Sequence, residues 1–413
     1  MIRRLPAALL SLFITTGALA ANATCQFEQV EVGAQKLGPW IDKSNWLAIE
    51  NQRLSLQAGE VFMPAWRLLP SGNETKVAAK QRQIDALPST DPLDGSRRDL
   101  GFLLDSRLYA DGLVVLRNGQ LVAERYRNGL APDKPRLLLE ATRPLLNLLG
   151  ALSISQGKLS NDKSIVRFLP SLTTSSGLRK MSVQRLLEDK EQPVWTSGEI
   201  ERWQQAAGWT TEASGTDVRN WLAQAGRWDR ALLETGGPLF AAAPEDDLLA
   251  WTLAESNAMP LSRLFCQQLL VRVRPEHPVL WLSDSQGVEL ASGLAMSLRD
   301  FAKLGQTLVE ARTGRNRGKI PAWFIETLTA SAGMRPAEIK GLTKGSELRY
   351  GFVHLGGSAN RVALIGAQGS SLFVDFDQRL VIAMFATRPG DHSAAMLATL
   401  EQVWKVIGHS NSH

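Results

Sequence analysis

Residues 113–123 read LVVLRNGQLVA, and this stretch is the strongest local indication of fold in the chain. Two apolar runs flank the segment 117–120, and its central pair, Asn118-Gly119, is the dipeptide that most favours the two-residue turn of a β-hairpin. The pattern therefore predicts two antiparallel strands joined at Asn118 and Gly119.

Further elements are predicted on the C-terminal side of this hairpin. A leucine-rich helix is expected from about Pro144 to Gln156, with its proline in the first turn, where a missing N–H does no harm. Residues 160–310 are predicted to be mostly helical, whereas strands at 371–375 and 380–386 and a helix at about 393–407 end the chain. Because both ends supply strands and the middle supplies helices, the sequence predicts an α+β protein, with an antiparallel β-sheet flanked by helices and a mostly helical second lobe.

Two helix starts stand out within the helical segment. One lies at Pro244, where residues 245–247 (Glu-Asp-Asp) place negative charge in the first turn, as the helix dipole favours. The other lies at Ser297, with Asp300 three residues on, which predicts a capping box. A cleft between two such lobes is the default place for a ligand.

Composition narrows the class of protein. The chain has 413 residues, with 46 Lys and Arg against 41 Asp and Glu, which excludes a disordered, collagen-like, coiled-coil or disulfide-rich small protein. The net charge of +5 is small for this length and no basic block occurs, so the sequence does not favour nucleic-acid binding. The length exceeds what one hydrophobic core usually supports, so two lobes and an extension are expected.

The first twenty residues have the organisation of a secretory signal peptide. Arg3 and Arg4 form a positive start, residues 5–19 are mainly apolar, and Ala18-Leu19-Ala20 offers the small residues of a cleavage site. The apolar run is too short and too interrupted for a membrane span. We therefore expect a signal peptide at 1–20 cut after Ala20, no membrane span after cleavage, and a periplasmic or secreted protein.

Beyond the signal peptide, two regions are predicted. Residues 21–98 read as an irregular N-terminal arm and a polar connector, and residues 99–410 as the main domain. Cys25 lies in the arm and Cys266 in an apolar stretch, and an oxidising compartment would permit a disulfide between them. The alternative is a buried Cys266 and a free Cys25, because pairing cannot be deduced from the sequence.

A series of motifs runs in order along nearly the whole mature chain. They are Asn45-Trp46 in the arm, Asp111–Val115 and Asn118-Gly119 in the hairpin, Gly157-Lys158-Leu159 with Phe168-Leu169-Pro170, Ser292-Gly293-Leu294 with Leu298–Gly305, and Gly366–Asp375. In this order they resemble the serine β-lactamase and penicillin-binding protein superfamily, in the branch of class C β-lactamases, esterases and 6-aminohexanoate-dimer hydrolases. The resemblance implies a β-lactamase/transpeptidase-like fold that spans 99–410.

The family's chemistry depends on Ser-x-x-Lys at a helix start, a tyrosine from the helical lobe, and a Lys/His-x-Gly element at the sheet edge. Spacing of three places serine and lysine on one helical face, so that the lysine can accept the serine's proton. This sequence departs at each element: Glu140 and Arg143 stand in the Ser-x-x-Lys position, Ala242 near the tyrosine position, and Gln368-Gly369 in the sheet-edge element.

Other residues offer little to replace the missing groups. Ser155 with Lys158 and Ser160 with Lys163 also match Ser-x-x-Lys, but such a pattern arises by chance. The first pair ends a predicted helix at a glycine instead of beginning one, and both pairs lie in the stretch that resembles the family's loop. None of the five histidines pairs with another at metal-ligand spacing, so we expect no metal and no cofactor. Five tryptophans between 195 and 228 could form an aromatic ligand surface or pack in the core.

Glu140 and Arg143 therefore carry two interpretations. Arginine stays protonated and cannot act as a base, and a carboxylate attacking an amide would give a mixed anhydride, so the pair could either hold a polar ligand or form a plain salt bridge. The favoured hypothesis is a catalytically silent envelope protein that binds a small molecule, a cell-wall fragment or a protein partner. The alternatives are an amidase, esterase or β-lactamase with a rearranged site, and a purely structural component.

Overall fold

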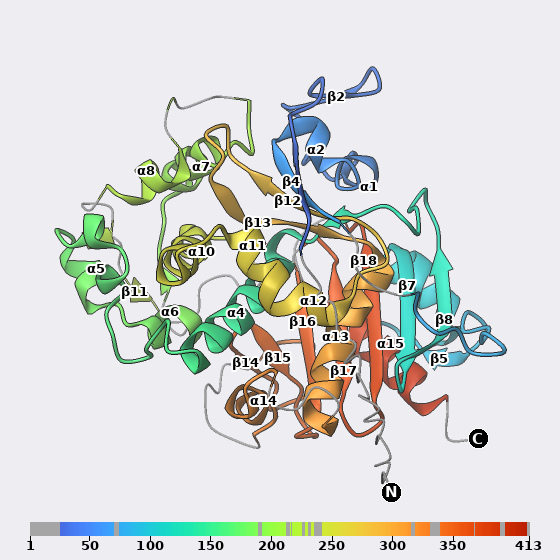
Figure 1. Cartoon of the computed structure of the whole chain (residues 1–413). Coiled ribbons are helices and arrows are strands. Elements are labelled where there is room, and N and C mark those ends of the chain that lie inside the picture. Colours follow the sequence, from blue (N-terminus) through green and yellow to red (C-terminus); the bar gives the residue numbers. More distant parts are fainter. Residues whose placement is uncertain are drawn as a thin grey trace, which may run out of the picture.

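The computed structural model describes residues 25–69, 74–188, 192–211, 215, 217–224, 228–229, 233–234, 242–314, 319–330, 339–366, 368–388 and 393–410. Figure 1 shows a large sheet with helices on both faces and a group of helices to one side. The predicted signal peptide lies outside the described residues. The α+β architecture is the one that the sequence predicts.

The main sheet has seven strands in the order β14-β15-β16-β17-β18-β7-β8, and every pair is antiparallel. Strands from both ends of the chain meet at its centre, where β18 pairs with β7 along its whole length. The bounds are Ala110–Arg117 for β7, Gln120–Tyr126 for β8, Glu347–Arg349 for β14, Phe352–His354 for β15, Arg361–Ile365 for β16, Ser371–Asp375 for β17 and Leu380–Ala386 for β18.

The hairpin predicted from residues 113–123 is present as β7 and β8. Asn118 and Gly119 have φ of 51° and 77°, which are the left-handed values that a type I′ turn requires at both central positions. The strands predicted at 371–375 and 380–386 are also confirmed, since β17 and β18 have these bounds.

Both faces of the main sheet are buried, which explains why its central strands are apolar without alternation. In β18, Val381 and Phe385 belong to one hydrophobic cluster, whereas Ile382 and Met384 belong to the other. Helix α13 (Leu298–Thr313) contacts the first face, and α15 (Ala394–His409) covers the second with Trp404, whose ring stacks on Phe373 at 5.0 Å. A strand between two helical layers has no solvent face to keep polar.

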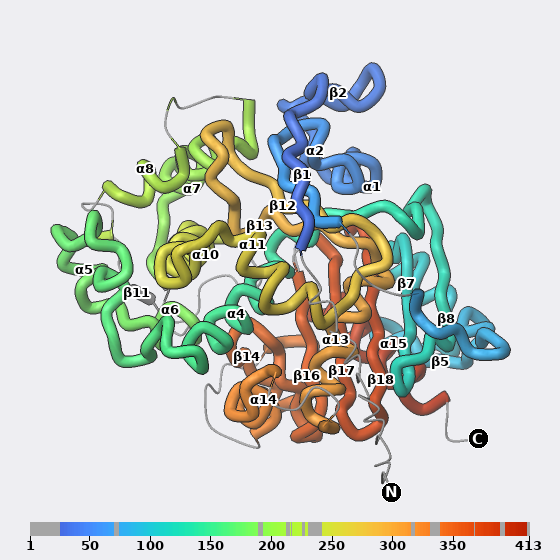
Figure 2. The backbone as a smooth tube through the Cα atoms, in the orientation of Figure 1, coloured from blue at the N-terminus to red at the C-terminus, as the bar shows by residue number. Residues whose placement is uncertain are grey.

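A second sheet corrects one expectation. Its five strands run in the order β1-β4-β12-β13-β9, with bounds Phe27–Val30, Ala65–Leu68, Val279–Ser283, Glu289–Met296 and Arg136–Leu137. The arm is therefore not irregular, because β4 pairs with both β1 and β12 (Figure 2). The mostly helical segment at 160–310 also contributes β12 and β13 to this sheet.

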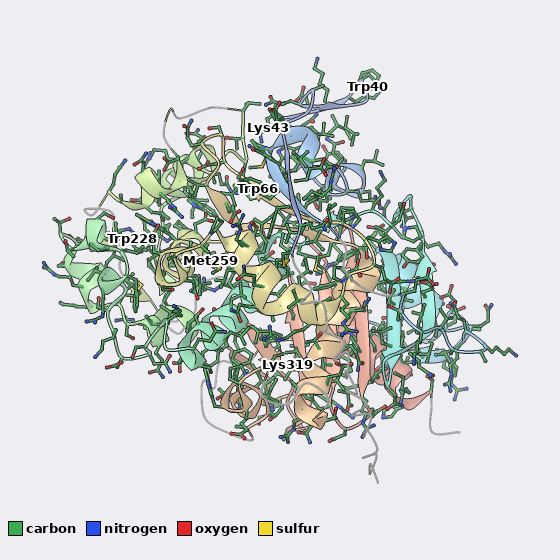
Figure 3. The ribbon with its side chains drawn as sticks, in the orientation of Figure 1. Trp40, Lys43, Trp66, Trp228, Met259 and Lys319 are labelled. Carbon is green, nitrogen blue, oxygen red and sulfur yellow. A yellow bond between two sulfur atoms is a disulfide. The ribbon has the colours of Figure 1, made fainter. Side chains whose placement is uncertain are left out.

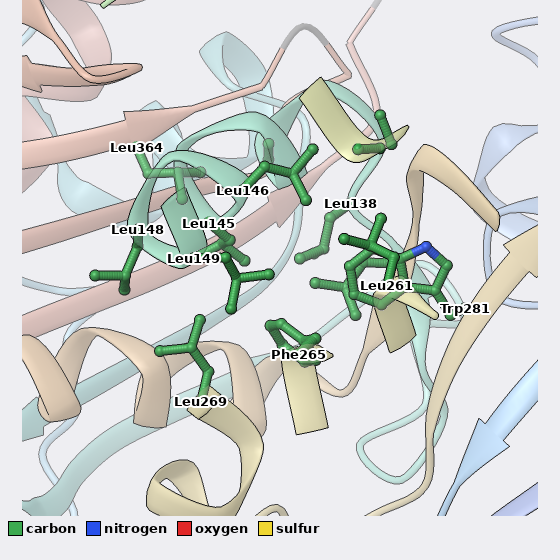
Figure 4. Close-up of a cluster of buried hydrophobic side chains, with 14 of the residues drawn as sticks. Leu138, Leu145, Leu146, Leu148, Leu149, Leu261, Phe265, Leu269, Trp281 and Leu364 are labelled. Carbon is green, nitrogen blue, oxygen red and sulfur yellow. The ribbon is translucent and has the colours of Figure 1, made fainter. Parts of the chain in front are cut away.

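The predicted leucine-rich helix is α4 (Arg143–Ser155), which begins one residue before Pro144. Its leucines pack against Phe265, Leu269 and Trp281 in the core shared by both sheets and the helical lobe (Figure 4). Nearly every residue of α4 is buried, so the protein packs around the whole helix. This packing fixes the position of the turn at 139–142, which directly precedes α4.

Helices α10 (Pro244–Asn257) and α13 begin where the sequence predicts. The capping box at Ser297 is only half formed. Ser297 Oγ accepts the N–H of Asp300 at 3.2 Å, but the Asp300 carboxylate accepts the backbone N–H groups of Glu276 and His277 at 2.7 and 3.1 Å. The acidic residue therefore fixes the preceding loop instead of the helix's own first N–H.

The remaining elements are short, and their bounds complete the description. They are β2 (Lys36–Leu37), β3 (Ile41–Asp42), α1 (Gln52–Ser55), α2 (Gly59–Phe62), β5 (Pro88–Thr90), β6 (Arg97–Asp99), α3 (Leu100–Phe102), η1 (Leu103–Arg107), η2 (Leu139–Thr142), η3 (Ile165–Arg167), η4 (Pro170–Leu172), α5 (Ser176–Lys180), α6 (Val183–Glu188), β10 (Gln192–Pro193), α7 (Ser197–Ala206), α8 (Val218–Leu222), β11 (Leu233–Glu234), α11 (Leu261–Phe265), η5 (Cys266–Leu270), α12 (Val271–Val273) and α14 (Ala322–Thr329). Among the described helices, none is long and apolar enough to cross a membrane.

A disulfide joins the arm to the helical lobe. Cys25 lies directly before β1, Cys266 begins η5, and their Cα atoms are 6.1 Å apart. Cys266 is buried, so the bridge anchors the start of the arm to the core beneath the second sheet.

Candidate active site

Glu140 lies on a strained turn at the start of α4. The turn is η2, and the residue before Glu140, Leu139, has a φ of 50°, although leucine rarely adopts left-handed backbone. Leu139 is buried in the main core, which provides the packing energy that holds this conformation. Backbone strain of this kind is concentrated at functional sites, where it fixes the direction of one side chain.

The end of strand β16 packs directly on the same turn. A Cβ added to Gly366 would lie 2.8 Å from the Cβ and 2.9 Å from the backbone nitrogen of Ala141. Only glycine allows so close an approach. The structure therefore brings the sheet-edge element and the turn of Glu140 together, although they are separated by more than 200 residues in the chain.

Arg143 is committed to structure by its contacts. The buried guanidinium forms an ion pair with Asp246 in the first turn of α10, and its Nη2 donates to the carbonyl of Leu186 at 2.5 Å. Asp246 in turn accepts the N–H of Ala243 at 3.1 Å. Arg143 thus ties α4 to α6 and α10.

The predicted ion pair between Glu140 and Arg143 is wrong. Within the described residues, no ion pair involves Glu140. The guanidinium of Arg143 pairs with the buried carboxylate of Asp246 instead. The Oε2 atom of Glu140 is enclosed and has no hydrogen-bond partner among the residues described. Burial raises the pKa of Glu140 to about 7, and the nearby Asp246 charge adds to this shift.

Replacing Glu140 with glutamine should remove a pH-dependent loss of stability. Because the carboxyl has a pKa of about 7 in the fold against 4.5 as its ordinary value, folding favours the protonated acid. Its contribution to stability is fully present below pH 4.5 and is lost as the pH rises to about 7. Wild type should therefore lose about 1–3 kcal/mol relative to Glu140→Gln between pH 4.5 and 8.

Urea denaturation at pH 4.5, 6 and 8 measures this difference. Asp247, whose pKa burial also raises to about 7, is common to both proteins and cancels in the comparison. Parallel pH profiles for the two proteins would show that Glu140 is ionised in the fold throughout this range.

The acidic first turn of α10 is held by indole and backbone donors. Trp195 Nε1 donates to Glu245 at 3.0 Å, and Trp203 Nε1 donates to Asp247 at 2.9 Å. The N–H of Ala291 in β13 donates to the other oxygen of Asp247 at 2.7 Å. The sequence explains residues 245–247 by the helix dipole. The structure adds that each of these three carboxylates also binds a residue outside α10.

The tryptophans between 195 and 228 pack in the core. Trp203, Trp209, Trp221 and Trp228 are all buried, and Trp195 packs against Trp221 and Trp228 with ring centroids 5.7 and 5.1 Å away. They do not form the exposed aromatic surface that was one of the two interpretations.

The other positions that resemble the family's site offer no proton acceptor of comparable strength. Ala242 is half-buried immediately before α10 and packs on the core with its methyl group. Gln368 is partly exposed in the turn after β16, and Gly369 has a φ of 89° and packs on Ala386 at the end of β18. Phe240, Ala241 and Ala367 lie outside the described residues.

The alternative Ser-x-x-Lys pairs lie far from this turn. Ser155 is the last residue of α4, about 20 Å from Glu140 at 1.5 Å per helical residue, and accepts a hydrogen bond from Trp323. Ser160 and Lys163 both bind the Asp162 carboxylate, at 2.7 and 2.9 Å. Tyr350 is buried among aromatic rings, and burial raises its pKa to about 12, so it is a poor base.

No group of three His, Cys, Asp or Glu side chains suited to a metal ion occurs in the described part of the chain. What the turn of Glu140 can supply is a carboxyl group that exchanges a proton near neutral pH, beside the end of β16 and the first turn of α10.

Comparison with known proteins gives the class of fold. No family model matches the sequence. A Bacillus anthracis protein described as a 6-aminohexanoate-dimer hydrolase superimposes with a TM-score of 0.72 at 18% identity, covering 89% of this chain and 96% of that one. A class C β-lactamase variant superimposes with a TM-score of 0.52 at 12% identity, covering 74% and 94%. The predicted β-lactamase/transpeptidase-like fold is confirmed.

Sequence similarity leads to the same group. The chain is 24% identical over 357 residues to the curated 6-aminohexanoate-dimer hydrolase of Paenarthrobacter ureafaciens, covering 80% of this chain and 89% of that protein. These likenesses support the serine β-lactamase and penicillin-binding protein superfamily that the sequence motifs resemble, and both of these relatives are named hydrolases.

Proposed function

We propose that this protein binds a ligand or partner at the turn of Glu140 and has lost the serine acyl-transfer chemistry of its superfamily. One observation supports the proposal: the segment that resembles Ser-x-x-Lys carries Glu140 and Arg143, and the guanidinium of Arg143 forms an ion pair with Asp246. Acyl transfer by this family requires a nucleophile and a base within hydrogen-bond reach of each other.

The residues at the positions that resemble the family's lysine and tyrosine do not supply the base. Arg143 cannot accept a proton, because guanidinium stays charged at physiological pH. Ala242 has no titratable atom. Attack by the Glu140 carboxylate on an amide would form a mixed anhydride from a weak nucleophile, which is unfavourable compared with a serine ester.

The same features suit recognition of a polar ligand. A carboxyl with a pKa of about 7 is present as both acid and carboxylate near neutral pH, so it can donate or accept a hydrogen bond. The signal-peptide pattern at 1–20 supports an exported protein, in which a cell-wall fragment, a small molecule or an envelope protein would be the partner.

A hydrolase with a rearranged site is the second candidate, and two observations favour it. The curated relative is named a hydrolase, and a carboxyl that titrates near pH 7 is suited to general-base activation of water. In this mechanism Glu140 would take a proton from water and no acyl-enzyme would form.

Covalent labelling and turnover separate the two candidates. We expect no adduct when the purified protein is incubated with a fluorophosphonate or a penicillin probe, as read by intact-mass spectrometry, and no turnover of nitrocefin or nitrophenyl esters. A stoichiometric adduct on any residue would refute the loss of acyl transfer.

Glu140→Gln is the matched control, because it keeps the side chain's shape and removes its titration. Turnover without an adduct that disappears in Glu140→Gln would support the general-base hydrolase and refute a pure binding role. Saturable binding of peptidoglycan fragments that weakens in Glu140→Gln would support the binding role directly.

A further inference from the structure

A polar cavity of about 480 Å³ lies at the end of the main sheet opposite to Glu140. Strand register gives this placement. Ile365, next to Gly366, is in register with Ser371 and through it with Met384, whereas Arg361, at the other end of β16, is in register with Asp375 and through it with Leu380. Leu380 pairs with Arg117, which leads into the Asn118-Gly119 turn that lines the cavity.

The walls of this cavity come from four segments. They are the connector at 74–76, the β7–β8 turn, helix α12 and the half-buried face of α13, with Lys319 beyond it. Figure 3 labels Lys319. These segments are distant in the sequence, and none of them contributes to the turn of Glu140.

Positive charge predominates in the lining. Five basic side chains face two acidic ones, namely Lys76, Arg272, Arg274, Lys303 and Lys319 against Glu74 and Glu310. The ammonium group of Lys303 already has partners, because it forms an ion pair with Glu276 at 3.4 Å and donates to the carbonyl of Arg274 at 2.5 Å. Among the described residues, Lys76, Arg272 and Lys319 form no ion pair, so an excess of positive charge remains.

Arg272 is the most informative of these residues. Its Nε and Nη1 atoms are enclosed and have no hydrogen-bond partner in the described part of the chain, which leaves Nη2 as its accessible donor. Burial lowers the pKa of Arg272, and no neighbouring carboxylate offsets that shift. A partly buried cation without a counter-ion is unfavourable, and an anion at Nη2 would compensate it.

We propose that this cavity binds a small molecule bearing a multivalent oxyanion, either phosphate or several carboxylates. Arg272 contacts the anion through Nη2, and Lys76 and Lys319 supply further charge from two other segments of the lining. A planar guanidinium matches the oxygens of phosphate and carboxylate, whereas ammonium groups act as point charges around them. The volume accommodates a ligand larger than a single phosphate.

Isothermal titration calorimetry with pyrophosphate and with citrate tests the proposal. Wild type should bind at least one of them saturably, and Arg272→Gln should weaken that binding about tenfold or more, as expected for loss of a charged hydrogen bond. Pyrophosphate preference would identify phosphate as the recognised group, and citrate preference would identify carboxylates.

Two further variants keep the test decisive. Lys319→Gln changes an exposed side chain and should also weaken binding while leaving the fold intact, even if Arg272→Gln fails to fold. Arg312→Gln removes the same charge from an exposed position on α13 outside the cavity and should have little effect. Absence of saturable binding, or binding that Lys319→Gln and Arg312→Gln weaken equally, would overturn the proposal.

Discussion

Replacing Cys25 with serine should lower the free energy of unfolding by about 4–5 kcal/mol, the largest effect that we expect from a single change. The disulfide joins residues 241 positions apart, so it restricts the unfolded chain strongly. It also holds the start of β1 against the lobe that contains Cys266. Without it, β1 is attached to the second sheet only through β4.

Urea denaturation of wild type, of Cys25→Ser and of Cys266→Ala measures this effect. Dithiothreitol should destabilise wild type to the level of Cys25→Ser and leave both variants unchanged. Equal stability of oxidised wild type and Cys25→Ser, or two free thiols in the non-reduced protein by mass spectrometry, would show that the bridge does not contribute.

Replacing Arg143 with alanine should destabilise the protein by about 3–5 kcal/mol, because it leaves the Asp246 carboxylate buried without its cation. The Leu186 carbonyl would lose a donor as well. Circular dichroism during thermal and urea unfolding gives the free energy. Arg179→Ala, which removes an exposed arginine from α5, is the matched control and should change stability by less than about 1 kcal/mol.

The double variant Arg143→Leu with Asp246→Leu sharpens this test. Removing both charges should be less destabilising than removing Arg143 alone, since the Asp246 carboxylate is then no longer buried without its guanidinium partner. If Arg143→Ala keeps full stability but abolishes ligand binding, Arg143 is a ligand-binding residue and not a structural one.

The first hairpin and the last two strands of the main sheet were predictable from local sequence. Asn118-Gly119 sets the turn, and the apolar runs on either side of 376–379 set β17 and β18. The starts of α4, α10 and α13 follow from Pro144, Pro244 and Ser297, because these residues act on the backbone within one turn.

The second sheet could not be predicted in the same way. Strand β4 lies in an arm with weak local preference, and its partner β12 is more than 200 residues further along. That pairing and the burial of Ala65 and Leu68 stabilise the strand conformation of β4. A short stretch of sequence around β4 does not include its distant partner, so it cannot predict this strand.

The candidate site shows the same limit at the level of single residues. Motif order predicts that Glu140 and Arg143 stand at the Ser-x-x-Lys position, but it does not give the partner of Arg143. A spacing of three allowed a pair with Glu140. In the fold, the carboxylate of Asp246 lies against the guanidinium, and Glu140 Oε2 has no hydrogen-bond partner among the described residues.

By itself the sequence determined the first hairpin and the main helix starts, because these depend on neighbours in the chain, and the order of its motifs gave the resemblance to the superfamily. Only the tertiary structure decided that Arg143 binds Asp246, that Glu140 is buried as a weak acid and that Arg272 faces a cationic cavity. Charge and burial depend on what packs nearby in space, and those contacts come from segments hundreds of residues apart.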